Sequence, residues 1–513
     1  MNRPLRCPPT RHSLAGNEPL GGPTPPTTPA RRGGDFAPRV VWAFIAAGVI
    51  AVLLGCPATG RAEDAFERLV ELEARYTELR GQARYRDALP LAQQMLVIAE
   101  RDLADRPELT AVSLENLAWI HNALGQSAAA ERLYQRSVPM FEKLYGREHP
   151  LVADSLNSLA NVYFSQRRYG DAIDLYRKML AIHQQAAGDN SPGVALAEHN
   201  LGGAYMELGR YREAEASYRR ALAIREATPG AITPETAETL NNLGILIFSQ
   251  GRYSEAETLL QRALAAFQQL LPPQHPRIAD ALNNLGNLCL YEGRFAQAET
   301  YYQRSLSIRR ATLGADHQDV GQSLNNLGIV CFDQFRLAEA EKYYQQALAT
   351  RARALGNDHP VVGDTLGNLA NLYESQRRQK DAEAAYQQAL AIYRKSFPAE
   401  HPRIALVLGN LAVVYQQTSR FDEAAAANRQ ALAIYEKVYG AEHPDVAQVI
   451  HNMAVAQLRA GHFAAALPLI TRAIESRDRL RVSDAQRSAS YRTRAEIHWE
   501  LKHQTEALAD LVR

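Results

Sequence analysis

The sequence has little lysine and almost no net charge. Seven Lys stand against fifty Arg, and the 513 residues carry a formal net charge of +1. Residues 1–61 contain seven Arg, Glu18 and Asp35, a net charge of +5, whereas residues 62–513 contain 50 basic and 54 acidic side chains, a net charge of −4. Because nucleic-acid binding depends on neutralising phosphates, a body this close to neutral predicts no nucleic-acid partner.

The short motifs of common catalytic sites are also missing. The sequence has no phosphate-binding glycine loop, no G-x-S-x-G motif and no H-E-x-x-H motif. Nearly every residue after position 63 belongs instead to a repeated pattern, which leaves no length of chain for a catalytic domain. We therefore expect no enzymatic activity, no catalytic residues, no cofactor and no metal site.

Only one long apolar run occurs, and it lies near the N-terminus. Residues 1–39 are rich in Pro, Gly and Arg and have no periodicity, a composition that predicts a disordered segment. Residues 40–54 are then strongly apolar, and 21 uncharged residues separate Arg39 from Arg61. This run is too isolated to be a helix of a soluble core, so we expect it to direct the chain to a membrane.

Three interpretations of the apolar run stay open. Residues 40–62 have the form of a secretory signal cleaved after about Ala62, and they are also long enough to span a bilayer as an uncleaved anchor. The stretch "LLGC", Leu53–Cys56, resembles a bacterial lipoprotein box, although Leu54 and Pro57 fit that box poorly. Each interpretation places the rest of the chain outside the cytoplasm. The predicted location is the bacterial cell envelope, in the periplasm, with membrane association through residues 40–60 in the anchored forms.

An internal repeat of 42 residues fills the rest of the sequence. Apolar residues within each unit follow i, i+3, i+4 and i+7 spacing, which predicts a helix A, a tight turn and a helix B. The register is marked by His149-Pro150, His275-Pro276, His359-Pro360, His401-Pro402 and His443-Pro444, with Pro192, Pro234 and His317 at the steps between. A proline here predicts the first turn of helix A, where no backbone N–H is needed.

Small residues recur at fixed positions of the unit. One alanine column predicts the place where helices A and B approach closely, because close packing needs a nearly absent side chain there. It runs through Ala88, Ala130, Ala172, Ala214, Ala256, Ala298, Ala340, Ala382, Ala424 and Ala466. A glycine column predicts the residue that ends helix B in a left-handed conformation. Its members are Gly146, Gly188, Gly230, Gly314, Gly356 and Gly440.

The pattern L-[GA]-x-x-Y…A-x-x-x-Y resembles the tetratricopeptide repeat. The 42-residue period and the wording H-P-x-V-A-x-x-L-N-N-L-A…G-R-Y-x-E-A-E-x-x-Y-x-R-A-L-x-I resemble the kinesin light chain subtype, which also occurs in bacterial proteins. The resemblance implies an all-α solenoid, a right-handed superhelix of helix-turn-helix units. We expect a degenerate repeat in residues 63–107, nine repeats in residues 108–485 and a degenerate repeat in residues 486–513.

Asparagine recurs in helix A one residue before the position that begins the L-[GA]-x-x-Y pattern. We call this asparagine position the rung column. Eight Asn in helix interiors forgo up to about 0.7 kcal/mol of helix propensity each, which suggests a role beyond folding the helix. The column consists of Asn116, Asn200, Asn242, Asn284, Asn326, Asn368, Asn410 and Asn452, with Ser158 as its exception. In the family, an asparagine here holds the main chain of a bound peptide in the inner groove, so the resemblance implies a peptide-binding ladder. The alternative is that each amide bonds a neighbouring turn or repeat, and both roles are compatible.

The residue before each rung forms a second polar column, which we call the flanking column. It contains Asn157, His199, Asn241, Asn283 and Asn325, followed by Gly367 and Gly409. We expect the four asparagines to line the groove beside the rungs. No Lys occurs in helix A of the nine central repeats, which argues against the carboxylate clamp of other family members and favours binding of peptide main chain.

Three other columns have structural interpretations. Equivalent residues of stacked repeats lie about 8–10 Å apart, so the histidines of the His-Pro column cannot share a metal ion and are predicted turn residues. The same spacing keeps Cys289 and Cys331 from forming a disulfide and predicts free core thiols. An arginine after helix A is predicted to compensate helix dipoles, with a ligand-binding edge as the alternative. This column is Arg168, Arg210, Arg252, Arg294, Arg336, Arg378 and Arg420.

The sequence therefore predicts a non-catalytic scaffold that holds extended protein or peptide segments at the bacterial envelope. One alternative is the sensor half of a signalling system, whose effector module is separate or follows Arg513. Another is a structural factor in the assembly of membrane complexes. The ligand and the oligomeric state have no signature in the sequence.

Overall fold

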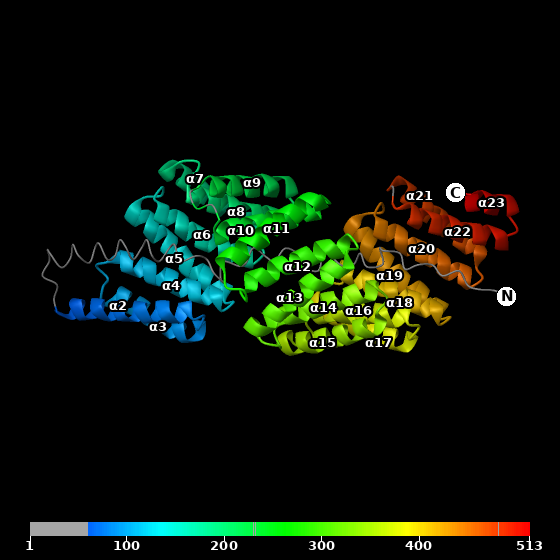
Figure 1. Cartoon of the computed structure of the whole chain (residues 1–513), viewed down its shortest axis with the longest axis horizontal. Helices are drawn as coiled ribbons and strands as arrows, with labels where there is room; N and C mark the ends of the chain where they lie inside the picture. The colour runs from blue at the N-terminus through cyan, green and yellow to red at the C-terminus, as the bar shows by residue number, and fades with distance from the viewer. Residues whose placement is uncertain (1–59, 229, 231, 481, 513) are drawn as a thin grey trace. The chain divides into compact units, whose positions relative to one another are not determined.

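The computed structural model describes residues 60–228, 230, 232–480 and 482–512, and all regular structure in these residues is helical. Its 22 helices carry the labels α2–α23 used in Figure 1. They fall into two compact units, which we call the first unit (α2–α11) and the second unit (α12–α23). Each unit is a stack of helix pairs, as expected of a tetratricopeptide solenoid.

The helices of the first unit are α2 (Gly60–Gly81), α3 (Tyr85–Arg101), α4 (Pro107–Ala123), α5 (Ser127–Tyr145), α6 (Pro150–Ser165), α7 (Tyr169–Ala187), α8 (Pro192–Glu207), α9 (Tyr211–Ala227), α10 (Pro234–Ser249) and α11 (Tyr253–Leu270). Those of the second unit are α12 (Pro276–Tyr291), α13 (Phe295–Leu313), α14 (Gln318–Asp333), α15 (Leu337–Leu355), α16 (Pro360–Ser375), α17 (Gln379–Ser396), α18 (Pro402–Gln417), α19 (Phe421–Tyr439), α20 (Pro444–Arg459), α21 (Phe463–Arg479), α22 (Asp484–Glu500) and α23 (Gln504–Val512). Even-numbered helices are helix A of a repeat and odd-numbered helices are helix B. Within a unit, the two helices of a pair pack along each other and each pair packs on the next.

Histidine caps most of the A helices. The Nδ1 atom of His149 accepts a hydrogen bond from the Leu151 N–H at 3.2 Å, and Pro150 occupies the first turn of α6. This bond satisfies one of the backbone donors that a helix start leaves without an intrahelical partner. The same bond forms at His275, His317, His359, His401 and His443. The prediction that these histidines are turn residues is confirmed, and no cluster of possible metal ligands occurs in the described part of the chain.

Left-handed residues end both helices of a repeat. Five of the six predicted glycines end helix B with positive φ, for example 87° at Gly146. The prediction is wrong for Gly230, because α9 ends at Ala227 and Thr228 is its C-cap. A second left-handed position, absent from the sequence prediction, lies in the turn from helix A to helix B. It is glycine in some repeats but Phe335 in one, with φ of 60°. A bulky residue is strained in this conformation, so the turn geometry is imposed by the packing of the two helices rather than by local preference.

Small residues bring helices A and B together, as predicted. All ten members of the alanine column have no exposed surface. On the opposite helix, a Cβ placed on Gly286 would lie 2.6 Å from the ring of Tyr302, and one on Gly328 would lie 2.6 Å from Tyr344. Tyrosine rings of helix B therefore occupy the space that glycine leaves on helix A.

The N-terminal predictions lie outside the described residues. The predicted disordered segment of residues 1–39 and nearly all of the apolar segment of residues 40–62 fall there, so both predictions stay predictions. Among the described helices, none is long and apolar enough to cross a membrane.

Candidate functional site

The rung and flanking columns are joined by hydrogen bonds between successive A helices. Asn200 donates from Nδ2 to Oδ1 of Asn157, one repeat earlier, at 2.8 Å. The same bond runs from Asn326 to Asn283 and from Asn368 to Asn325, each at 3.0 Å. A rung amide thus lies directly beside the flanking amide of the preceding repeat, and the two columns form one polar strip along the A helices of a unit.

The first rung uses a carboxylate in place of the flanking amide. Asn116 donates from Nδ2 to Glu73 Oε2 at 2.9 Å, and Glu73 stands one repeat before Glu115 in the flanking column. The hydroxyl of Tyr76 also donates to the Asn116 backbone oxygen at 3.1 Å. The repeat-to-repeat bond therefore extends to the degenerate first repeat, where the sequence alone did not reveal it.

The remaining rungs have other surroundings. Asn242 accepts a weak bond from the adjacent Asn241 amide at 3.3 Å, and Asn284 is buried. Asn452 accepts from Gln448 at 2.8 Å, and Ser158 donates to the Asp154 backbone oxygen at 3.1 Å. Asn410, which follows Gly409, lies beside the Tyr386 hydroxyl. For Asn410 and Asn452 the flanking residue one repeat earlier is a glycine, Gly367 and Gly409 respectively, which has no side-chain oxygen to accept a bond.

These bonds bear on the two interpretations of the ladder. An Asn amide has two donor hydrogens and an acceptor, so one internal bond leaves further capacity for a ligand. Asn325 does not show such capacity: its Oδ1 accepts from Asn368 and its Nδ2 has no hydrogen-bond partner among the described residues, but the side chain has no exposed surface and is not accessible to a ligand. The internal role of four rungs, Asn116, Asn200, Asn326 and Asn368, is observed, and the peptide-binding role of the column stays a prediction.

A third asparagine position of helix A was not distinguished by the sequence. Asn161 accepts a hydrogen bond from the Tyr176 hydroxyl at 2.6 Å, and Asn287 accepts one from Tyr302 at 2.7 Å. In each pair the tyrosine follows the asparagine by 15 residues, and it belongs to helix B of the same repeat. The pairing of Asn with Tyr in only some repeats was the signal that could have revealed this contact.

The polar strip is partly exposed across α4, α6 and α8 of the first unit, and we call this part the α4–α8 strip. Its partly exposed side chains are Glu115, Asp154, Asn157, Ser158 and Asn200. The sequence prediction included Asn157 and Asn200 but missed the two carboxylates. Glu115 occupies the flanking column, where several other repeats have Asn. This acid in place of an amide was the signal in the sequence that could have revealed the carboxylate.

Both carboxylates of the α4–α8 strip have raised pKa values. Burial raises the pKa of Glu115 to about 7, with a further contribution from the negative charge of Asp154 and partial compensation by the Ser155 hydroxyl. Burial alone raises the pKa of Asp154 to about 6. Removing carboxylates from water without a cationic partner disfavours their charged form. The strip therefore offers hydrogen-bond acceptors whose charge depends on pH near neutrality.

The arginine column connects repeats on another face. Arg336 contacts Glu299 of the preceding helix B at 2.8 Å and Glu339 of its own helix B at 2.5 Å. Arg378 and Arg420 make equivalent pairs of contacts. The prediction of a structural role is supported, although the observed partners are side chains in two repeats. Cys289 and Cys331 are buried free thiols, as predicted.

Comparison with known proteins identifies the family. Family models described as tetratricopeptide repeat match residues 132–185, 151–227, 235–311, 277–351, 319–395 and 403–479, and further models of that description match residues 199–270 and 110–151. These matches cover more than half of the chain. The chain belongs to the tetratricopeptide-repeat family. A search of curated proteins found no match to it.

Several solved structures are similar to this tetratricopeptide protein. BtubC (BKLC) from P. vanneervenii is 25% identical over 45% of this chain and 92% of its own, with a TM-score of 0.40. A Podosopora anserina protein named for the kinesin light chain, with nearly identical TPR-like repeats, is 24% identical over 41% of this chain and 99% of its own, with a TM-score of 0.36. Apo RapI is 15% identical over 72% of this chain and 98% of its own, with a TM-score of 0.52. The quorum sensor NprR from B. thuringiensis, also apo, is 17% identical over 72% and 99%, with a TM-score of 0.51.

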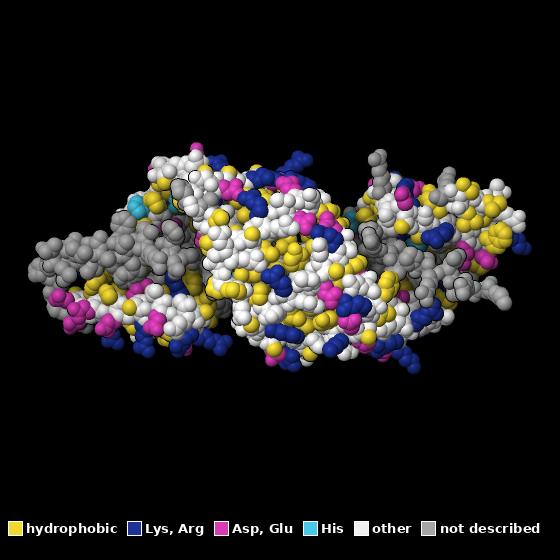
Figure 2. Space-filling view, in the orientation of Figure 1, with side chains coloured by type: hydrophobic (Ala, Val, Ile, Leu, Met, Phe, Trp, Pro, Cys, Tyr) yellow, Lys and Arg dark blue, Asp and Glu magenta, His cyan; other side chains and the backbone are white. Residues whose placement is uncertain are grey.

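The similarity to RapI and to NprR shows the fold alone, and it agrees with the helical stack described above. Tetratricopeptide arrays are generally non-catalytic scaffolds whose extended surfaces bind other proteins or peptides. On the face shown in Figure 2, basic and acidic side chains intermingle over α12–α17.

Proposed function

We propose that this tetratricopeptide protein is a non-catalytic scaffold that binds an extended segment of a partner protein along the α4–α8 strip. The observation that carries the proposal is the continuity of the strip. The bond from Asn200 to Asn157 aligns the amides of two repeats, and Asp154 and Glu115 extend the polar row to the preceding repeat. An extended peptide has exposed N–H and C=O groups along its length, which such a row of amides and carboxylates can bind.

The chemistry of the α4–α8 strip favours a particular kind of contact. Asp154 has no hydrogen bond or ion pair through its carboxylate among the described residues, so its oxygens are free to accept from a ligand. A backbone N–H or a cationic side chain supplies the donors that these oxygens lack. Binding such a group also stabilises the charged form of Asp154 and Glu115, so ligand binding is coupled to release of protons.

The test is selection of random linear peptides displayed on phage by the full chain, followed by affinity measurements on the enriched peptides. Asp154→Ala removes acceptors from the strip without removing a bond between repeats, so it should weaken binding while the melting temperature holds. The matched control is Gln261→Ala, which alters an exposed side chain on α11, the helix B of another repeat. This variant should leave binding unchanged. Failure to enrich any peptide, or equal affinity of the Asp154→Ala variant, would contradict the proposal.

We also propose that the protein acts in the bacterial cell envelope, either after cleavage near Ala62 or anchored through residues 40–60. The apolar residues 40–54, preceded by an arginine-rich segment, support this location. A C-terminal fusion to alkaline phosphatase should be active in a bacterial host, because that enzyme needs the oxidising side of the membrane to form its disulfides. An intact but inactive fusion would place the protein in the cytoplasm.

A further inference from the structure

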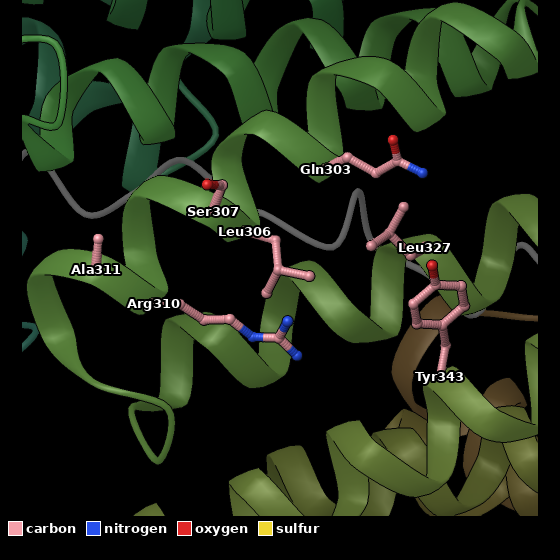
Figure 3. Close-up of a pocket in the computed structure, with 7 residues that line it drawn as sticks. All are labelled: Gln303, Leu306, Ser307, Arg310, Ala311, Leu327 and Tyr343. Atoms are coloured by element: carbon pink, nitrogen blue, oxygen red, sulfur yellow. The ribbon is translucent and has the colours of Figure 1, made fainter.

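Polar groups that are partly buried without a partner indicate a ligand more strongly than exposed ones do. A shallow hollow on α13, α14 and α15 is bordered by Gln303, Ser307 and Arg310, which are open to solvent (Figure 3). Exposed side chains keep their water and need no partner. A partly buried charge has lost much of its water, and its burial costs free energy unless another group compensates it. Asp154 of the α4–α8 strip is such a charge.

Asp154 belongs to a column of acids on helix A that bind an arginine in other repeats. Three repeats later, a carboxylate oxygen of Asp280 lies 2.8 Å from the guanidinium of Arg309. Two repeats further along, Asp364 contacts Arg403 at 2.8 Å. Asp154 has no ion pair among the described residues, and burial alone raises its pKa to about 6. The acid is therefore present in this repeat without the cation.

The two positions that supply an arginine elsewhere hold other residues here. His183 stands 29 residues after Asp154, as Arg309 does after its acid. Gly193 stands 39 residues after it, as Arg403 does after its acid. The imidazole of His183 lies on Gly193, its Nε2 has no hydrogen-bond partner among the described residues, and burial lowers its pKa. Neither residue brings a charge to Asp154 at neutral pH.

Arg309 shows which groups a guanidinium binds at this place in the repeat. It donates to Asp280 at 2.8 Å on one A helix and to the backbone oxygen of Asp319 at 3.0 Å on the next. The corresponding acceptors in the first unit are the carboxylate of Asp154 on α6 and the backbone oxygen of Gly193 on α8. Both of these residues are partly exposed, so a side chain from outside the chain can reach them.

The neighbouring carboxylate of Glu115 also lacks a donor that its counterpart has. One repeat earlier, Glu73 Oε2 accepts from the rung amide of Asn116 at 2.9 Å. The rung that follows Glu115 is Ser158, the exception in the rung column, and its hydroxyl donates to the Asp154 backbone oxygen at 3.1 Å. The serine bonds that Glu115 accepts all end on Oε1. Two carboxylates close enough to repel each other are thus both short of donors.

We propose that an arginine side chain of the bound segment supplies these donors, with its guanidinium on Asp154 and within reach of Glu115. The inference rests on the proposed binding of a protein segment to the α4–α8 strip, and it names one residue of that segment. A guanidinium carries five N–H donors in a planar fork, so it can bind one carboxylate through two parallel bonds and another acceptor through a third. A backbone N–H offers one donor and no charge, so it cannot replace the cation that the equivalent acids have.

A single substitution turns the chain into its own competitor for this site. His183→Arg puts a guanidinium where Arg309 lies in its repeat. The residue 30 positions earlier is alanine in both cases, Ala153 and Ala279, so the same space is available beside the new side chain. The introduced arginine should pair with Asp154 within the chain and exclude the arginine of the ligand, while the melting temperature holds.

The experiment starts with random decapeptides displayed on phage and selected on the immobilised full chain. Arginine should recur at one position of the enriched peptides. One enriched peptide is then labelled with fluorescein and made with that arginine, with lysine, or with citrulline, which has nearly the same shape without the charge. Fluorescence anisotropy should show about 10- to 100-fold weaker binding of the citrulline peptide, the usual effect of losing hydrogen bonds to a charged group. The lysine peptide should have intermediate affinity, because an ammonium has no fork.

The variants locate the effect. Asp154→Asn and His183→Arg should each weaken the arginine peptide about as much as citrulline does, and they should leave the citrulline peptide unchanged. The matched control is Asp174→Asn, which removes the same charge from an exposed position on α7 and should have no effect on either peptide. Melting temperatures of all variants establish that each is folded.

Failure of this inference is distinguishable from failure of the proposed function. Enrichment of no peptide contradicts both. Enriched peptides without a recurring arginine, equal affinity for the citrulline peptide, tighter binding of the lysine peptide, or unchanged affinity of a folded Asp154→Asn or His183→Arg variant would overturn the inference alone. An equal loss in Asp174→Asn would also overturn it, because the attraction would then come from the general charge of the unit.

Discussion

Asn428 is a buried amide without a partner, and replacing it with isoleucine should stabilise the protein. The residue lies on α19 with no exposed surface, and neither Oδ1 nor Nδ2 has a hydrogen-bond partner among the described residues. At the same position of other repeats a tyrosine donates to an asparagine 15 residues earlier, as Tyr302 does to Asn287. The residue 15 positions before Asn428 is Val413, which offers no side-chain acceptor.

The next repeat shows what fits there. Ile470 occupies the equivalent position on α21, is fully buried and follows Ala454 and Val455 in the same relation that Asn428 has to Ala412 and Val413. Isoleucine at position 428 would therefore face the same pair of neighbouring residue types. The surrounding packing has already accepted this combination once in the chain.

The size of the effect follows from three contributions. Removing a buried polar group that lacks a partner recovers about 1–3 kcal/mol of unfolding free energy. Burying an isoleucine side chain contributes roughly 1.5–3 kcal/mol more, while fitting a larger side chain costs about 1–3 kcal/mol in a close-packed interior. The expected result is a net gain of about 1–3 kcal/mol for Asn428→Ile.

Urea unfolding followed by circular dichroism measures the global effect, and amide hydrogen exchange in α18 and α19 locates it. Exchange is needed because repeat arrays respond through nearest neighbours and can unfold in parts. The matched control is Asn161→Val, which removes the acceptor of a buried tyrosine hydroxyl and should destabilise by about 1–3 kcal/mol. A loss of stability in Asn428→Ile would refute the reasoning, because it would mean that the amide has a partner, such as a bound water, in solution.

Three further predictions concern other positions. Asn326→Ala should lower the melting temperature, because Oδ1 of the buried Asn283 loses its donor; a rise would mean that the rung contributes only to ligand binding. Phe335→Gly should raise the unfolding free energy by about 0.5–1 kcal/mol in urea titrations, since its left-handed backbone strains an exposed phenylalanine; a loss would show that the ring makes a stabilising contact. The raised pKa of Glu115 means that the folded state holds a proton that the unfolded state releases, so the first unit should lose stability as pH rises from about 4.5 to about 7. Glu115→Gln should flatten this dependence in melting curves recorded across that range, and an unchanged slope would assign it to other groups.

The repeat pattern was sufficient to predict the secondary structure and its stacking. The 42-residue period, the alanine column and the glycine that ends helix B are all local steric requirements, and each leaves a residue type that recurs visibly in the sequence. The sequence predicted the histidines as turn residues but not as helix caps; the cap is nevertheless local, because His149 bonds a backbone N–H only two residues away. Features of this kind depend on near neighbours in the chain and can be inferred without coordinates.

The partners of the asparagines depended on the tertiary structure. Asn326 and Asn283 are 43 residues apart, and an amide in a groove gives the same sequence pattern as an amide that bonds the next repeat. Only the placement of successive A helices distinguishes these roles, and it shows an internal bond at Asn326, while the peptide-binding role of the column stays a prediction.

The sequence by itself determined a tetratricopeptide stack of helix pairs, its register and the absence of a recognisable catalytic motif, because these follow from periodic local sterics. The tertiary structure alone decided which polar groups bond across repeats, and that burial raises the pKa values of Glu115 and Asp154. Those properties arise from burial and from distances between residues about one repeat apart, which the order of residues along the chain does not specify.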